Sequence, residues 1–141
     1  MKTTNTDRDK PLSRLLVVDD DPDNASVLKL ILVNDGFLVD AFTNAEEALQ
    51  KFKSNPQDYR LVLSDSWMPE LSGIQLAEKV KETNPNVKVL VLTGSEIIDN
   101  EASDMSRSTS VDGFIQKPIG IRELTDRILS IIGETKVSSS F

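Results

Sequence analysis

The sequence predicts an α/β domain: a five-stranded parallel sheet, doubly wound, with helices on both faces. Short apolar runs alternate five times with segments of helical periodicity, and strand-helix repeats of this kind place parallel strands side by side through right-handed crossovers. Residues 15–18 and 61–63 are apolar at every position, as expected of strands that are covered on both faces. The common strand order for five such units is 2-1-3-4-5, as in flavodoxin-like folds, with a crevice between the first and third strands.

Composition excludes several classes of function. The 141 residues suit one domain, and they include neither cysteine nor histidine, so disulfides, zinc sites of Cys or His, a Ser-His-Asp triad and a phosphohistidine carrier are excluded within this chain. The net charge of −7 argues against direct nucleic-acid binding; it suits a metal ion or a basic protein surface, or simply solubility. We expect a cytoplasmic protein without membrane contact, because no apolar run approaches ~18 residues and residues 1–14 lack a signal-peptide core.

Capping and helix-breaking residues mark the helix boundaries. Pro22 suits the first turn of a helix, and the pairs Asn44 with Glu47 and Ser72 with Gln75 are spaced as capping boxes. Helix ends are marked by Gly36, Pro85 and Gly133. Strands are expected at 15–18, 37–41, 61–63, 87–93 and 114–116. The apolar helix faces are expected at Val27, Leu28, Ile31 and Leu32; Ala45, Ala48, Leu49 and Phe52; Ile74, Ala77 and Val80; and Ile121, Leu124, Ile128 and Ile131 or Ile132.

The domain is expected over 14–133, between flexible tails at 1–13 and 134–141. Residues 95–112 have poor helix propensity because serines and acids interrupt the apolar positions. A fourth helix there is expected to be short, irregular or mobile.

Charged and hydroxyl side chains follow the predicted strands where each strand ends. Asp19 and Asp20 follow the first strand, Asp65 the third, Thr93 the fourth and Lys117 the fifth, so all five residues are expected at one edge of the sheet. Two like charges ~4 Å apart cost roughly 4 kcal/mol at an effective dielectric of about 20, and three clustered carboxylates therefore need cations. Lys117 supplies one, and Mg²⁺ fits as the other because it binds one or two carboxylates together with waters and phosphate oxygens.

This pattern resembles the receiver domain of two-component response regulators. The resemblance covers about 14–133. It is carried by Leu-Val-Val-Asp-Asp at 16–20, Asp65 followed by Met68-Pro69 and Gly73, Thr93, and Phe114 followed by Lys117-Pro118. Each motif is weak alone, but in this order and at these strand ends they are strong together. The segment 108–113 departs from the alanine- and glycine-rich helix end usual in the family.

The resemblance implies a role for each residue at the acidic edge. Asp65 is the expected phosphoacceptor, taking a phosphoryl group from the phosphohistidine of a sensor histidine kinase. Asp20 would bind Mg²⁺ directly, Asp19 mainly through water, and Trp67 through its backbone carbonyl. Lys117 would pair with Asp65 and then with the phosphoryl oxygens.

The resemblance also implies a switch. Thr93 would be drawn toward the new phosphoryl group and Phe114 would follow it inward, altering a face made by the fourth helix, fifth strand and fifth helix. Phe114 as plain core packing remains the alternative. Pro118, directly after Lys117, resembles the cis-proline of the family, so a cis Lys117–Pro118 bond is expected. The Trp67 ring would hinder water that attacks the acyl phosphate, or else it serves as a core or partner contact.

We therefore expect a stand-alone receiver, a phosphorylation-controlled switch rather than an enzyme, present as a monomer or weak dimer. Its output is either docking to a downstream protein or transfer of phosphate to a histidine phosphotransfer protein. A phosphorylation-independent binding module is an alternative, as is a fragment of a longer regulator or hybrid kinase. A Mg²⁺-dependent phosphatase is disfavoured because Trp67 stands where its second aspartate would be.

Overall fold

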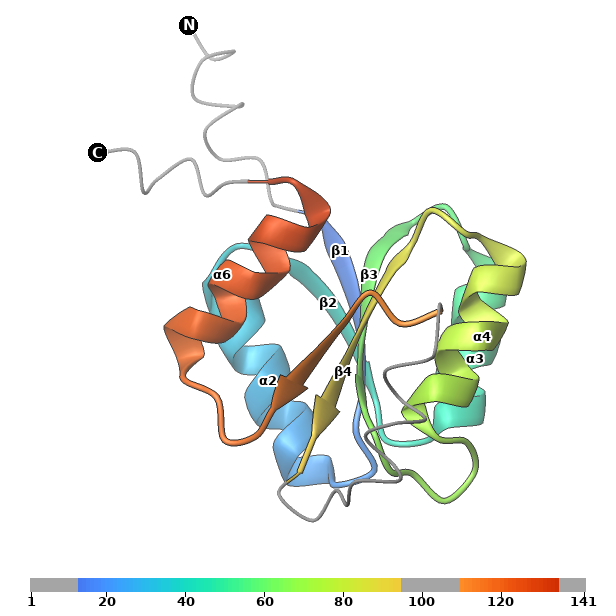
Figure 1. The fold of residues 1–141 in the computed structure, drawn as a ribbon, viewed down its shortest axis with the longest axis horizontal. Helices are drawn as coiled ribbons and strands as arrows, with labels where there is room; N and C mark the ends of the chain where they lie inside the picture. The colour runs from blue at the N-terminus through green and yellow to red at the C-terminus, as the bar shows by residue number, and fades with distance from the viewer. Residues whose placement is uncertain (1–12, 95–109, 135–141) are drawn as a thin grey trace, which may run out of the picture.

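The computed structural model describes residues 13–94 and 110–134. Five parallel strands form one sheet in the order β2-β1-β3-β4-β5, as predicted. The strands are β1 (Arg14–Val18), β2 (Leu38–Phe42), β3 (Tyr59–Asp65), β4 (Lys88–Thr93) and β5 (Gly113–Gln116). Because they are parallel, their carboxyl ends lie at one edge of the sheet (Figure 1).

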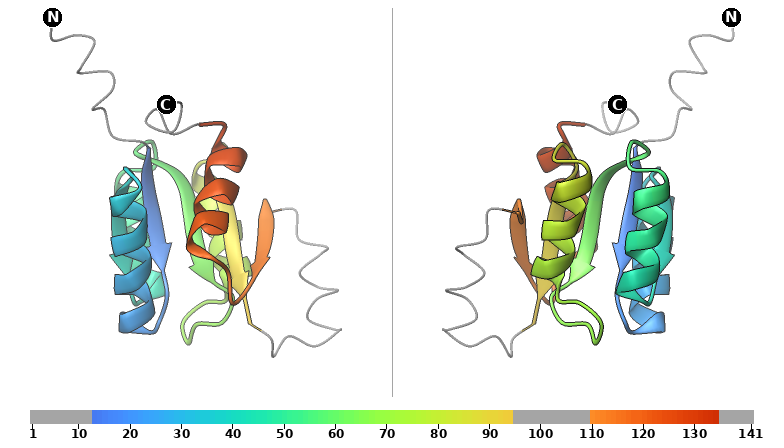
Figure 2. Two further views of the ribbon diagram at one scale, coloured as in Figure 1. Left: turned by 90° about the vertical axis from the view of Figure 1, so that its left-hand side faces the viewer. Right: turned by 90° about the vertical axis from the view of Figure 1, so that its right-hand side faces the viewer.

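Helices cover both faces of this sheet. The described helices are α2 (Pro22–Asn34), α3 (Ala45–Ser54), α4 (Gly73–Thr83) and α6 (Ile121–Ile132). Helices α2 and α6 lie against one face, and α3 and α4 against the other (Figure 2). Most of the region expected to hold an irregular fourth helix, 95–112, falls outside the described residues.

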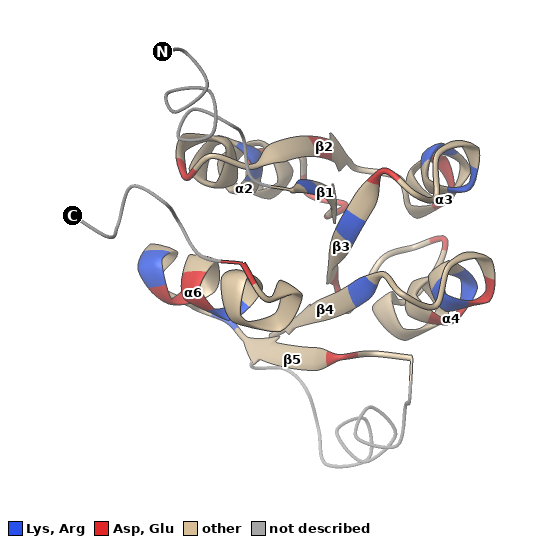
Figure 3. Ribbon diagram, turned by 90° about the horizontal axis from the view of Figure 1, so that it is seen from above, with Lys and Arg blue, Asp and Glu red and all other residues tan. Residues whose placement is uncertain are grey.

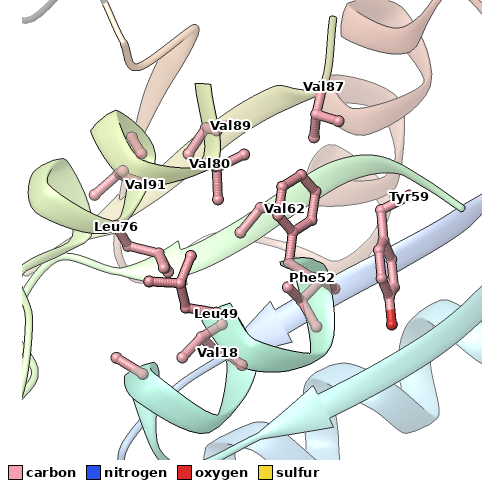
Figure 4. Close-up of a cluster of buried hydrophobic side chains, with 14 of the residues drawn as sticks. Val18, Leu49, Phe52, Tyr59, Val62, Leu76, Val80, Val87, Val89 and Val91 are labelled. Atoms are coloured by element: carbon pink, nitrogen blue, oxygen red, sulfur yellow. The ribbon is translucent and has the colours of Figure 1, made fainter. Parts of the chain in front are cut away.

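The core has two parts, one on each face of the sheet. Alternate strand residues point to opposite faces, so Val62 packs toward α3 and α4 while Leu61 and Leu63 pack toward α2 and α6. On the first side, the Phe52 and Tyr59 rings lie 6.0 Å apart between centroids and fill the space under α3 (Figure 4). Burial on both faces explains the continuous apolar runs in β1 and β3.

The helix faces match the predictions in part. All four residues expected on α3 are buried. Two predictions were wrong, because Val27 is 54% and Ile121 59% exposed. On α4, Leu76 is fully buried and Ile74 only half-buried. The apolar residues of α2 are spread around the helix, so periodicity could not show which side faces the sheet.

Local hydrogen bonds explain where the helices begin and end. Ser72 and Gln75 form both bonds of the predicted capping box, at 3.1 and 3.0 Å. Asp21 caps α2, with Pro22 as its first residue. Gly133 ends α6 with a φ of 75°, a conformation that glycine adopts without steric cost. Across the described ranges, no helix is both long and apolar enough to cross a membrane.

Candidate functional site

Three carboxylates meet at the carboxyl edge of the sheet. Asp19 and Asp20 directly follow β1, and Asp65 is the last residue of the neighbouring strand β3. One oxygen from each carboxylate lies within 4.8 Å of the others. The expectation that these side chains converge is thereby confirmed, although residues 20 and 65 are 45 positions apart in the sequence.

Asp19 is the buried member of this cluster. Its side chain is 2% exposed, and burial raises its pKa above the ordinary value, with the charge of Asp65 adding to the effect. Two hydrogen bonds hold it: the Asp21 N–H donates to Asp19 Oδ1 at 3.0 Å, and the Asp19 N–H donates to the Phe42 carbonyl at 3.0 Å. Asp20 is exposed, so it offers its carboxylate to the solvent side of the cluster.

Lys117 supplies a positive charge to Asp65. Its side-chain Nζ lies 3.1 Å from Asp65 Oδ1. Its backbone N–H donates to the Thr93 carbonyl at 2.7 Å. The Lys117–Pro118 peptide bond is cis, in agreement with the prediction. The Ser66 N–H also donates to Asp65 Oδ1, at 3.0 Å, so one oxygen of this carboxylate receives both contacts.

Thr93 is the last residue of β4, and Phe114 lies on the neighbouring strand β5. Thr93 is buried, and its Oγ1 donates to the Ile115 carbonyl at 3.4 Å. This hydroxyl therefore links the end of β4 to β5. Phe114 is half-buried and packs against the core on the α3 and α4 side, so its ring has both a core contact and access to solvent.

The loop from Ser66 to Ser72 forms the rim of the site beyond Asp65. Trp67 is 73% exposed, whereas the next residue, Met68, is 3% exposed. The Gly73 N–H donates to the Ser66 carbonyl at 3.1 Å and closes the loop. A Cβ on Gly73 would lie 2.7 Å from the Asp65 carbonyl oxygen, so a side chain there would collide with the backbone of the site.

The strands run from basic starts to an acidic edge. Arg14, Arg60 and Lys88 occupy the first or second positions of β1, β3 and β4, and Figure 3 shows their positive charges on these neighbouring strands. Arg14 pairs with Asp40 and Arg60 with Glu134. The acidic cluster is therefore separated from these bases by the length of the strands, and within residues 13–94 and 110–134 the cation paired with the cluster is Lys117.

A doubly wound sheet with an acidic cluster at its carboxyl edge is typical of small α/β domains that bind their ligands at that edge. Within this class, the family model of the response regulator receiver domain matches residues 15–129. The chain therefore belongs to the response regulator receiver family.

Individual relatives agree with this assignment. The transcriptional regulatory protein CpxR homolog of Haemophilus influenzae is 37% identical over 122 residues, which cover 86% of this chain and 51% of that protein. The chain thus spans about half the length of this relative. The response regulator receiver protein CpdR of Brucella abortus is 32% identical, with 83% of this chain and 94% of that protein covered.

Solved structures show the same fold. A response regulator receiver domain protein from Clostridium thermocellum matches with a TM-score of 0.78 at 29% identity, covering 86% of this chain and 95% of that one. The response regulator TrrA of Thermotoga maritima, solved in complex with Mg²⁺-BeF, matches with a TM-score of 0.73 at 33% identity, covering 85% of this chain and 99% of that one.

Proposed function

We propose that this receiver domain accepts a phosphoryl group on Asp65 from the phosphohistidine of a sensor histidine kinase, in a Mg²⁺-dependent reaction. The observation that carries the proposal is the convergence of three carboxylate oxygens within 4.8 Å, with Lys117 held against one of them. The domain acts as a signalling switch that assists its own phosphorylation, not as an enzyme on a free substrate. The domain binds the kinase in the cytoplasm.

The arrangement around Asp65 suits nucleophilic attack. Among the described residues, the Ser66 N–H and the Lys117 ammonium both contact Oδ1, which leaves Oδ2 to attack phosphorus. The new O–P bond forms as the P–N bond to the donor histidine breaks, and the histidine nitrogen keeps that electron pair. Phosphoryl transfer depends mainly on positioning and charge stabilisation, and Lys117 is placed to stabilise the charge on the transferred oxygens.

The donor atoms at the cluster fit magnesium. Asp19, Asp20 and Asp65 offer carboxylate oxygens, the ligands that this small hard cation prefers, and the Trp67 carbonyl is a proposed fourth protein ligand. When bound, Mg²⁺ neutralises charge on the phosphoryl oxygens and on the carboxylates. The crowding of two further acids against the buried Asp19 supports a cation there, because burial and the charge of Asp65 both raise the pKa of Asp19 and so disfavour its charged form.

We also propose how the signal leaves the site. Thr93 bridges β4 and β5 through the Ile115 carbonyl. When its hydroxyl turns to an oxygen of phosphorylated Asp65, that bridge is released. Phe114, one residue before Ile115 and half-buried, then moves inward and alters the surface of β5 and α6 where a downstream protein docks. Transfer onward to a histidine phosphotransfer protein would use the same acyl phosphate.

The test is phosphorylation by acetyl phosphate with Mg²⁺, followed by intact mass. One phosphoryl group per chain is expected, and none on Asp65→Asn or without Mg²⁺. Asp126→Asn is the matched control because Asp126 is an exposed acid on α6. Labelling that survives Asp65→Asn would refute Asp65 as acceptor. Turnover of a phosphate ester would indicate a phosphatase, and inertness of the wild type would favour a phosphorylation-independent module.

A further inference from the structure

The rim loop, residues 66–72, is fastened to the rest of the domain at its base and its middle. At the base, the Ser66 N–H donates to the Leu92 carbonyl at 2.9 Å, and the Gly73 N–H donates back to the Ser66 carbonyl. In the middle, the buried Met68 side chain holds the loop to the core, and the partly buried Leu71 also packs against it. Glu70 lies between Met68 and Leu71, on the exposed side of the loop.

Glu70 provides a contact there, and it reaches a different helix. Its Oε1 accepts a hydrogen bond from the Ala45 N–H at 3.3 Å. Ala45 is the first residue of α3, and Asn44 already caps the Glu47 N–H of the same turn at 2.9 Å. The first N–H groups of a helix have no partner within the helix and favour a negative charge, so the Glu70 carboxylate and the Asn44 side chain satisfy two separate donors.

This contact connects the two sides of the acidic cluster. The segment before α3 contains Phe42, whose carbonyl accepts the Asp19 N–H. The loop that Glu70 belongs to begins directly after Asp65. Glu70 therefore joins the loop that follows Asp65 to the segment that holds Asp19.

We infer that Glu70 is a positioning residue of the cation site: by hydrogen-bonding to the start of α3 it holds the rim loop, and with it the Trp67 carbonyl, against the Asp19 side of the cluster. This inference rests on the proposed function, because it concerns the proposed ligand Trp67. Glu70 acts through the backbone of the loop. Its role depends mainly on the acceptor oxygen that it offers to the Ala45 amide, because the charge of an exposed carboxylate at a helix start is screened by salt.

The test compares Glu70→Ala, which removes the acceptor, with Glu70→Gln, which keeps an acceptor oxygen and removes the charge. Glu46→Ala is the matched control, since Glu46 is an exposed acid in the first turn of the same helix. Mg²⁺ affinity is measured by calorimetry, and hydrogen exchange at the Ala45 amide reports the contact itself. Neither measurement requires phosphorylation.

We expect Glu70→Ala to weaken Mg²⁺ binding by about threefold to tenfold, which corresponds to the loss of one hydrogen bond. The Ala45 amide should exchange faster in the same variant. Glu70→Gln and Glu46→Ala should stay within about twofold of wild type at an ionic strength of about 0.15 M, because each changes only a surface charge that salt screens there.

Equal weakening by Glu70→Ala, Glu70→Gln and Glu46→Ala would show that only negative charge matters, and would overturn the inference. Wild-type affinity in Glu70→Ala would also overturn it, while Asp65-dependent phosphorylation in that variant would leave the proposed function standing. Absence of saturable Mg²⁺ binding in the wild type would instead reject the metal site, and this inference with it.

Discussion

Replacing Asp19 by asparagine should make the metal-free protein more stable, which is unusual for a buried residue. Asparagine keeps an oxygen to accept the Asp21 N–H and has nearly the same volume as aspartate. The substitution removes a buried negative charge that lies within 4.8 Å of two others. The reason is electrostatic, because without a bound cation the three carboxylates repel one another.

The magnitude follows from the charges around Asp19. Two unit charges 4.8 Å apart repel by roughly 3.5 kcal/mol at an effective dielectric of about 20. Asp19 has two such neighbours, but exposure of Asp20 screens one repulsion and the attraction to Lys117 opposes both. We therefore expect Asp19→Asn to raise the free energy of unfolding by about 1–3 kcal/mol at neutral pH without Mg²⁺.

The effect should shrink as the pH falls. The pKa of Asp19 is raised in the folded protein, so the native state binds this proton more tightly than the unfolded chain does. The contribution of Asp19 to stability is then fully present below the ordinary aspartate pKa of about 3.9, and it is lost as the pH rises through the raised value. Wild type and Asp19→Asn should accordingly converge on acidification.

The assay is urea unfolding at low ionic strength, with and without 10 mM Mg²⁺. For a site half-filled at about 1 mM, this concentration stabilises the wild type by about 1.4 kcal/mol, and Asp19→Asn should respond much less. A destabilising substitution at a buried polar residue usually costs about 1 kcal/mol. If the free energy of unfolding of metal-free Asp19→Asn is lower than that of wild type by more than this, repulsion among the carboxylates does not destabilise the fold.

Three further predictions concern the surroundings of the site. Gly73→Ala should lower the free energy of unfolding by about 2–4 kcal/mol, because its Cβ would lie 2.7 Å from the Asp65 carbonyl oxygen; a loss under about 0.5 kcal/mol in urea unfolding would contradict this close approach. Thr93→Ala should leave Mg²⁺ affinity within about twofold while abolishing the chemical-shift change at Phe114 on adding beryllofluoride, since only the bridge to Ile115 is removed; a persisting change would show that the hydroxyl does not transmit the signal. Asp112→Ala should lower the free energy of unfolding by about 1.5–3 kcal/mol, because its carboxylate accepts from the Val89 N–H at 2.8 Å, and the exposed pair with Lys81 adds little; a neutral result in urea unfolding would mean that the amino end of β5 is held by other contacts.

The sequence alone determined the class of fold and the residues at its active edge. The apolar runs of β1 and β3 are continuous because both faces of a parallel sheet are buried, and this pattern needs no coordinates to be recognised. Once the strands are parallel and adjacent, Asp19, Asp20 and Asp65 must share an edge. The capping box at Ser72 was equally predictable, because a helix start is decided within four residues.

Tertiary structure decided the features that depend on how a helix is rotated or which loops meet. The apolar pattern of α2 placed Val27 inward, but its packing on the sheet leaves Val27 half-exposed. The sequence contained no sign of the bond between Glu70 and Ala45, which joins residues 25 positions apart. Such contacts depend on the path of an irregular loop after the core has formed, and no periodicity encodes that path.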